Sequence, residues 1–403
     1  MIHGFLESGD LWMPFEQRFA ANGYCPEDLR AFDWDPLGGD EAAVLALDAY
    51  IDGVRTATGD DVVDLVAHAG GGDLAYAYLA DAAHAAKVNS YVHLAGSPED
   101  GPAGPAESPV PTANLRSPAD PVVEGADIPG ASNLVVGSED HIQVASSDTA
   151  FNLVFQFLGA GKKPSTLDRA DAPPGDATSP RSISGRALTY GENRPLAGWS
   201  VEAWPLVADT GMRSGTAPAA TFTTAADGAW GPLAAEAGVA YELYLRGPGA
   251  ADRPVHHYRE PFVASSQLVD LHALPSADSL LHVLFNGVEV DADHAVVIVQ
   301  TATQAVQSGR DSLTIDATAL ATATLAAPER ATTTFVVYDD GADGRSTGEV
   351  AAFGNVFDTT LVGVDQLLPS DPARAIAIAF GARTLHVPAW PSDSDGWVMA
   401  TFD

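Results

Sequence analysis

Basic residues are scarce in this sequence. Twenty Lys and Arg stand against 54 Asp and Glu among 403 residues, the net charge is -34, and only three of the basic residues are lysines. A nucleic-acid-binding surface needs a basic patch, so this balance argues against nucleic acid as a partner. The acids are spread over every segment, and a surface that repels itself in this way needs counter-ions. We therefore expect adaptation to high salt; an acidic exported protein from a GC-rich organism is the alternative.

Cysteine pairs, long apolar runs and a leader are also missing. Cys25 is the single cysteine, which excludes an intrachain disulfide and a cysteine-based metal site. No stretch of 18 apolar residues exists, so the sequence predicts no membrane-spanning helix. The chain opens on Met1-Ile2-His3-Gly4, without the basic and apolar regions of a signal peptide. We expect a location outside the cell or at its surface, which requires a leader ahead of this sequence.

The chain divides into regions that differ in composition and in their secondary-structure signals. Residues 1–160 alternate helix and strand signals, which favours a parallel sheet with helices on both faces. Residues 161–182 have the composition of a linker. Residues 183–275 and 276–403 carry strand-like runs divided by Gly, Pro and Asp turns, and they are expected to form one or two β-sandwich or barrel domains.

The expected elements follow from apolar spacing. In the first region, helices are expected over 15–22, 40–58, 74–86 and 149–158, and strands over 62–67, 90–94, 114–116 and 133–136. In the β regions, strands are expected over 182–187, 199–205, 219–224, 240–245, 280–285, 295–300, 312–315, 332–338 and 376–380.

The stretch from 62 to 72 is the most informative part of the sequence. An apolar strand ends in a tight glycine-rich turn, and a helix follows at once, which is the pattern of a nucleophile elbow. Such a turn needs small residues two places before and after the nucleophile, and Ala67 and Gly71 meet this need. The Gly70 N–H is placed to bind a forming oxyanion, helped by the helix N-terminus. Ala69, however, occupies the nucleophile position. A phosphate-binding loop is the alternative, but the stretch lacks its Lys and Ser/Thr.

Two further residues follow in the chain order of a Ser–acid–His triad. Asp120 comes after a short expected strand, and His141 comes after the next one. The ends of adjacent parallel strands bring an acid within hydrogen-bond reach of an imidazole. Their alternative roles are a turn residue before proline and an ordinary loop histidine. At the start of the chain, the N–H of Phe5 is the expected second oxyanion donor.

These motifs resemble those of small bacterial α/β-hydrolase lipases and esterases. Residues 63–68 followed by x-Gly-Gly are similar to the Ala-His-Ser-x-Gly-Gly elbow of that family, and His3-Gly4-Phe5 is similar to the end of its oxyanion strand. Residues 117–123 resemble its acid loop, and residues 130–142 its histidine loop. The resemblance covers residues 1 to about 160. It implies an α/β-hydrolase core without a large lid or a cofactor, acting on acyl ester or lipid.

The β regions resemble, more weakly, the C-terminal β-domains that some archaeal and bacterial lipases use for lipid contact. Trp390 and Trp397 are candidates for such a lipid-facing patch, and burial in a β-core is the alternative. Trp12 and Phe15 follow the oxyanion turn and are expected to line the acyl pocket, unless Phe15 belongs to a helix core.

The sequence departs from the family pattern in two ways. Ala69 lacks the hydroxyl, and neither Ser8 nor Ser90 lies on an elbow that would replace it. The chain also begins at the end of the oxyanion strand, which is central in this fold and is expected between residues 29–34 and the elbow strand. We therefore expect either a start upstream or a fragment capped by Met1.

Three functions remain open. The chain is a carboxylic ester hydrolase that is inactive as given because of Ala69, a natural pseudo-enzyme that binds lipid or polymer, or a surface protein that binds through its β domains. No metal site is expected. The adjacent His256 and His257 would face opposite sides of a strand, and the acidic loop 339–344 lacks the terminal Glu of a calcium loop.

Overall fold

The computed structural model describes the chain except for residues 170, 172–177, 280 and 352–359. The chain forms two compact units. Unit 1 comprises residues 1–176 together with two short later segments, 191–194 and 264–269, and unit 2 comprises 177–190, 195–263 and 270–403. Part of the predicted linker, 161–182, lies outside the described residues. Within the described chain, no helix combines the length and the hydropathy needed to cross a membrane.

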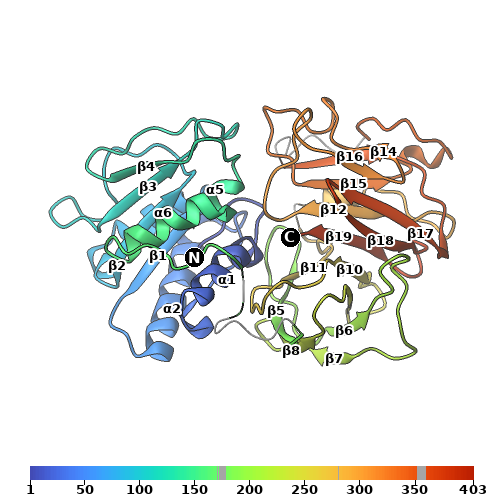
Figure 1. Ribbon diagram of the computed structural model, residues 1–403, viewed down its shortest axis with the longest axis horizontal. Helices are drawn as coiled ribbons and strands as arrows, with labels where there is room; N and C mark the ends of the chain where they lie inside the picture. Colours follow the sequence, from blue (N-terminus) through green and yellow to red (C-terminus); the bar gives the residue numbers. More distant parts are fainter. Residues whose placement is uncertain (170, 172–177, 280, 352–359) are drawn as a thin grey trace. The chain divides into compact units, whose positions relative to one another are not determined.

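Unit 1 contains a parallel sheet in the order β1-β2-β3-β4 (Figure 1). Its strands are β1 (Val63–His68), β2 (Val88–Leu94), β3 (Thr112–Arg116) and β4 (Ser132–Val135). Its helices are α1 (Met13–Ala21), α2 (Asp40–Thr58), α3 (Gly70–Leu79), α4 (Ala82–Ala85), α5 (Gln143–Ser146) and α6 (Asp148–Leu158), with short 3-10 turns η1 (Gly9–Trp12) and η2 (Pro26–Asp28). This alternation confirms the α/β-hydrolase type of core predicted for the first region.

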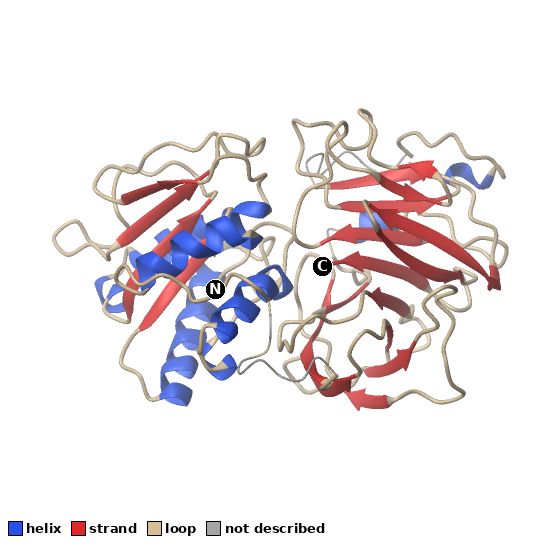
Figure 2. Ribbon diagram, viewed as in Figure 1, coloured by secondary structure: helices blue, strands red, loops and turns tan. Residues whose placement is uncertain are grey.

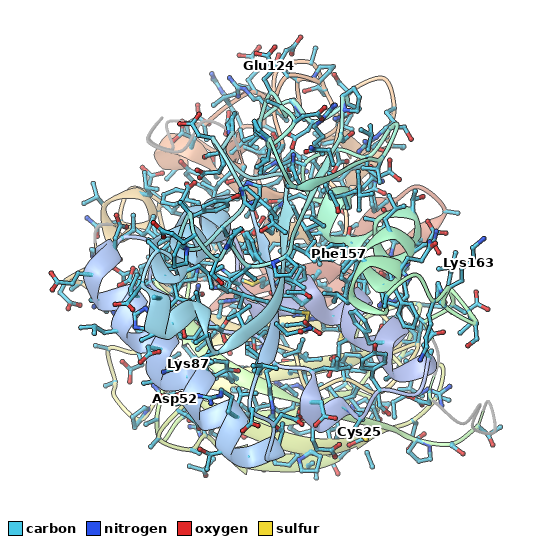
Figure 3. The ribbon with its side chains drawn as sticks, turned by 90° about the vertical axis from the view of Figure 1, so that its left-hand side faces the viewer. Cys25, Asp52, Lys87, Glu124, Phe157 and Lys163 are labelled. Carbon is cyan, nitrogen blue, oxygen red and sulfur yellow. The ribbon has the colours of Figure 1, made fainter. Side chains whose placement is uncertain are left out.

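The helices of unit 1 form two groups, α2 with α3 and α1 with α5 and α6. Helix α2 ends as predicted at Gly59, which adopts the left-handed conformation at φ 80°. Lys87, which precedes β2, links α2 to this strand. Its ammonium donates to Asp48 at 2.6 Å and to Asp52 at 2.8 Å, and both carboxylates belong to α2 (Figure 3). Ser147 is the N-cap of helix α6, and its hydroxyl accepts from the Ala150 N–H.

Ile2 lies between the elbow strand and Phe32 in unit 1. Ile2 forms isolated parallel bridges to Ala67 on the elbow strand and to Phe32 on the other side. Its N–H donates to Val66 O at 2.8 Å, and its carbonyl accepts from His68 N at 3.0 Å. The position between these two neighbours is the one expected for the oxyanion strand. Residues 29–34 are expected as a strand. They pair with the start of the chain only through the bridge between Phe32 and Ile2, so they form no continuous ladder.

The regular secondary structure of unit 2 is mainly β-strand, and loops connect the strands (Figure 2). Its largest sheet has eight strands in the order β16-β15-β12-β19-β10-β9-β6-β7, and two smaller sheets run β11-β5-β8 and β14-β13-β17-β18. The strands are β5 (Arg181–Thr189), β6 (Ser200–Pro205), β7 (Ala220–Thr223), β8 (Ala229–Ala235), β9 (Tyr241–Arg246), β10 (Val255–Arg259), β11 (Leu271–Ala273), β12 (Val297–Thr301), β13 (Leu313–Ile315), β14 (Thr318–Ala319), β15 (Thr334–Tyr338), β16 (Leu361–Asp365), β17 (Asp371–Phe380), β18 (Arg383–Ala389) and β19 (Trp397–Phe402). A helix α7 (His282–Phe285) and a 3-10 turn η3 (Asp340–Ala342) complete it.

In unit 2 the structure contains strands that the sequence analysis does not expect, namely β8, β10, β11, β14, β16, β18 and β19, and it differs from the prediction in two further respects. The expected strand 280–285 is wrong for its described part, where His282–Phe285 form α7; a short apolar run fits either element. The two predicted β domains, 183–275 and 276–403, also share one sheet. Strand β10 pairs in parallel with β19 from Val255–Trp397 to Arg259–Thr401, so the ladder continues across the predicted boundary.

Candidate active site

The turn between β1 and α3 has the geometry of a nucleophile elbow. Ala69 separates the strand from the helix and adopts φ 48° and ψ -125°, a conformation that costs a non-glycine residue free energy. The turn is tight, because a methyl group added to Gly71 would lie 2.4 Å from His3 O. Glycine at 71 is therefore required by the approach of the oxyanion turn, as the small-residue pattern predicts. The elbow is complete except for a nucleophilic side chain.

Asp120 and His141 are brought together beside this elbow. Asp120 Oδ2 accepts from His141 Nδ1 at 2.8 Å, and the two side chains are 2% and 6% exposed. Burial alone would raise the pKa of Asp120, but the hydrogen bond and charge of His141 outweigh it, and the pKa is lowered. The other carboxylate oxygen accepts from Val122 N at 2.8 Å and Val123 N at 3.1 Å. A fixed, ionised carboxylate of this kind orients an imidazole for acid–base work.

The two predicted oxyanion donors also meet at the elbow. A methyl group added to Gly70 would lie 3.8 Å from the main-chain nitrogen of Phe5. Gly70 is the first residue of α3, whose N-terminus carries partial positive charge. The arrangement suits a hole for negative charge above Ala69.

Trp12 and Phe15, predicted to line the acyl pocket, are both fully buried. Phe15 packs edge-on against Trp12 at 5.9 Å and against Phe151 at 5.5 Å, measured between ring centroids. These contacts place Phe15 in the aromatic core between α1 and α6. The substrate-binding role of both residues stays a prediction.

Glu7 is a site residue that the sequence reasoning missed. Its Oε2 accepts from Gly4 N at 2.5 Å and lies 2.9 Å from His68 Nδ1. A methyl group added to Gly4 would lie 2.6 Å from this oxygen and 2.9 Å from the Cβ of Ala69, so the carboxylate sits close to the empty nucleophile position. Residues 7 and 68 are 61 positions apart in the sequence, and no local sequence pattern predicts their contact.

The remaining candidate residues have structural partners. His93 is buried in β2, where Tyr91 and Ser97 O contact its two ring nitrogens at 2.8 and 3.0 Å. His256 contacts Glu242 at 2.6 Å and stacks on Trp390 with ring centroids 4.8 Å apart. Trp397 is buried in β19.

In the described part of the chain, no group of three or more His, Cys, Asp or Glu side chains is arranged to hold a metal ion. In the acidic loop 339–344, Asp339 accepts from Gly344 N at 3.0 Å.

A cavity of about 310 Å³ in unit 1 does not belong to this site. It lies at the start of β1, and its mostly apolar lining includes Ile2, Leu29, Phe32, Leu47, Ile51 and Val63. The elbow is at the opposite end of the same strand. We therefore assign the chemistry to the elbow and not to this cavity.

Comparison with known proteins supports a lipase relationship. Residues 179–275 match the sequence profile of the lipase C-terminal domain. A search of curated proteins gave no match.

Solved structures with some similarity include a predicted CIB-like hydrolase from Thermoplasma acidophilum (15% identity, 39% of this chain, 83% of that chain, TM-score 0.30) and a Bacillus licheniformis lipase in its mature form (18%, 39%, 89%, 0.31). A shaft pilin from Lactobacillus rhamnosus GG is also similar (10%, 55%, 96%, 0.19). At these values the similarities do not bear on substrate or activity.

The elbow, the buried Asp120–His141 pair and the matched lipase C-terminal domain define the class of this protein. Unit 1 has the α/β-hydrolase type of fold, and residues 179–275 are similar to the lipase C-terminal domain. Ala69 stands at the turn between β1 and α3, where the sequence pattern predicts a nucleophile.

Proposed function

We propose that this chain is a carboxylic ester hydrolase scaffold that binds acyl esters and, as it stands, does not cleave them. The supporting observation is the conformation of Ala69. The residue keeps a costly elbow backbone, although it has no hydroxyl to present, beside an intact Asp120–His141 pair. Of the three positions that correspond to a Ser–acid–His triad, only the nucleophile lacks its functional side chain.

The chemistry of the completed site follows from this geometry. A serine hydroxyl at position 69 would attack the ester carbonyl carbon while His141 takes its proton, and the carbonyl oxygen would become an oxyanion facing Phe5 and Gly70. When the intermediate collapses, His141 returns the proton to the departing alcohol. Water then attacks the acyl-enzyme by the same route and releases the carboxylic acid. Asp120 holds the imidazole and stabilises its charged form.

The test is the Ala69→Ser variant, assayed in high salt on p-nitrophenyl esters of several chain lengths. We expect hydrolysis at least about a thousandfold faster than with the unaltered chain, because loss of a triad nucleophile costs this much or more. The activity must vanish in the Ala69→Ser/His141→Ala double variant. A folded Ala69→Ser protein that stays inert, and remains inert when Glu7 is also replaced by Gln, would exclude this function.

A second candidate function rests on the match of residues 179–275 to the lipase C-terminal domain. In this proposal the β region attaches the protein to lipid or polymer outside the cell or at its surface, and the pocket holds an acyl chain without turnover. Flotation of the full chain with phosphatidylcholine vesicles in high salt tests the attachment. Recovery of the protein in the vesicle-free fraction at every lipid concentration would contradict it.

A further inference from the structure

The hydrogen-bond partners of His68 indicate the protonation state of its ring. Its Nε2 lies 2.9 Å from the main-chain carbonyl oxygen of His141, and its Nδ1 lies 2.9 Å from Glu7 Oε2. A carbonyl oxygen and a carboxylate oxygen only accept hydrogen bonds, so both ring nitrogens must donate. A ring with two N–H groups is an imidazolium. Glu7 and His68 therefore form an ion pair beside the elbow.

The two ends of this pair face different parts of the site. The carboxylate end lies at Gly4 N and beside the Ala69 methyl group, next to the turn that carries Phe5. The imidazolium end packs against the ring of His141, with ring centroids 4.7 Å apart at an interplanar angle of 48°. Asp120 also contacts that ring, through its hydrogen bond from His141 Nδ1.

This orientation opposes the charge separation of ester hydrolysis. In the transition state, negative charge grows on the oxygen above the elbow and positive charge grows on His141. The Glu7–His68 pair places a negative group beside the first and a positive group beside the second. Interactions that are less favourable in the transition state than in the ground state slow the chemical step.

We propose that Glu7, acting through its ion pair with His68, is a second residue that lowers the activity of this site, independently of the alanine at position 69. The inference rests on the proposed hydrolase function, and it adds that restoring the nucleophile gives only part of the activity of the scaffold. Glu7 here is a positioning residue for charge and is not itself a catalytic group.

The electrostatics of the two residues agree with the geometry. For Glu7, burial acts to raise the pKa, but the charge and hydrogen bond of His68 and the charge of His141 lower it. For His68, burial acts to lower the pKa, but the charge and hydrogen bond of Glu7 and the bond to His141 O raise it. The pKa shift of each residue is thus in the direction that favours its charged form.

The experiment compares Ala69→Ser with Ala69→Ser/Glu7→Gln, because glutamine is isosteric and keeps an oxygen for Gly4 N. We expect kcat to rise about tenfold or more in the double variant with little change in KM, since a tenfold rate corresponds to a modest electrostatic change. Without the carboxylate charge, His68 loses the partner that raises its pKa, and the acid limb of the pH profile of kcat/KM moves to higher pH. Ala69→Ser/Glu124→Gln, which neutralises an exposed glutamate, is the matched control (Figure 3).

Equal or lower kcat in a folded Glu7→Gln double variant, with an unmoved acid limb, would overturn the proposal while leaving the hydrolase function intact. If neither variant hydrolyses esters, the hydrolase function falls and nuclear magnetic resonance decides the charge state separately. In the unaltered chain labelled at histidine, we expect both His68 ring nitrogens to carry protons at neutral pH, and in Glu7→Gln we expect one of these protons to be lost at a lower pH than in the unaltered chain. A singly protonated His68 in the unaltered chain would also overturn the proposal.

Discussion

The ring of His68 packs on the ring of His141 and hydrogen-bonds to the main-chain carbonyl of the same residue at 2.9 Å. The residue before the nucleophile position therefore fixes the loop that carries the site histidine. Because His68 is itself paired with Glu7, three segments distant in sequence converge on one polar cluster. The first prediction concerns the stability of this cluster.

The Glu7–His68 pair should stabilise the fold most strongly in mildly acidic solution. The pKa of Glu7 is lowered from 4.5, so its contribution is present above pH 4.5 and is lost as the pH falls through the folded value. The pKa of His68 is raised from 6.5, so its contribution is complete below pH 6.5 and is lost as the pH rises through the folded value. The difference in unfolding free energy between the unaltered chain and Glu7→Gln, from urea titrations, should thus peak between these values. A difference that is flat from pH 4 to 9 would contradict the pairing.

Asp120 should be needed for catalysis once a nucleophile is present. In the Ala69→Ser background, Asp120→Asn removes the acceptor that fixes the His141 tautomer, and kcat should fall by about ten-thousandfold. KM should change little, because Asp120 contacts the histidine and two main-chain N–H groups of its own loop. Steady-state kinetics measure both constants. A loss smaller than tenfold would show that another group orients His141.

The elbow strain should be measurable through Ala69→Gly. Glycine adopts φ 48° and ψ -125° without the clash of a Cβ, so the substitution should raise the unfolding free energy by about 1 kcal/mol despite the extra freedom of the unfolded chain. Ala75→Gly is the control, because Ala75 lies inside α3 and glycine there should destabilise by about 1 kcal/mol. Urea unfolding of both variants tests the contrast. Destabilisation by both substitutions alike would mean that the elbow holds no strain at residue 69.

The sequence was informative where chemistry and local geometry coincide. A short apolar strand, small residues and glycines are all needed within one turn, so the elbow at Ala69 was predictable, and so were the later positions of Asp120 and His141. Glu7 was not, because its contact depends on a turn in which Leu6 adopts a positive φ of 59° and on a partner 61 residues away. The shared sheet of unit 2 was also unpredictable, since neither Val255–Arg259 nor Trp397–Phe402 is among the expected strands and no local pattern predicts that β10 and β19 are neighbours.

Glu16 should make unit 1 less stable as the pH rises. Its carboxylate is buried, accepts from Ser266 Oγ at 2.5 Å and Gln267 N at 3.0 Å, and burial raises its pKa to about 7. The folded state holds this proton more tightly than the unfolded state, so the contribution is full below pH 4.5 and declines as the pH rises through 7. Glu16→Gln should be more stable than the unaltered chain at pH 8 by roughly 2–3 kcal/mol, with no such gain at pH 4.5. The exposed Glu41→Gln on α2 should show no pH-dependent difference in the same urea titrations.

Salt should stabilise the whole chain. A net charge of -34 spread over its surface is self-repelling, and the distance over which charges act falls from about 10 Å at 0.1 M salt to about 3 Å at 1 M. We expect the thermal midpoint to rise steadily between 0.1 and 2 M KCl, with most of the gain from screening at the lower end. Non-ionic osmolyte at matched water activity is the control, because it leaves the repulsion in place. A midpoint that responds equally to osmolyte and to KCl would remove the case for salt adaptation and favour the alternative of an ordinary acidic exported protein.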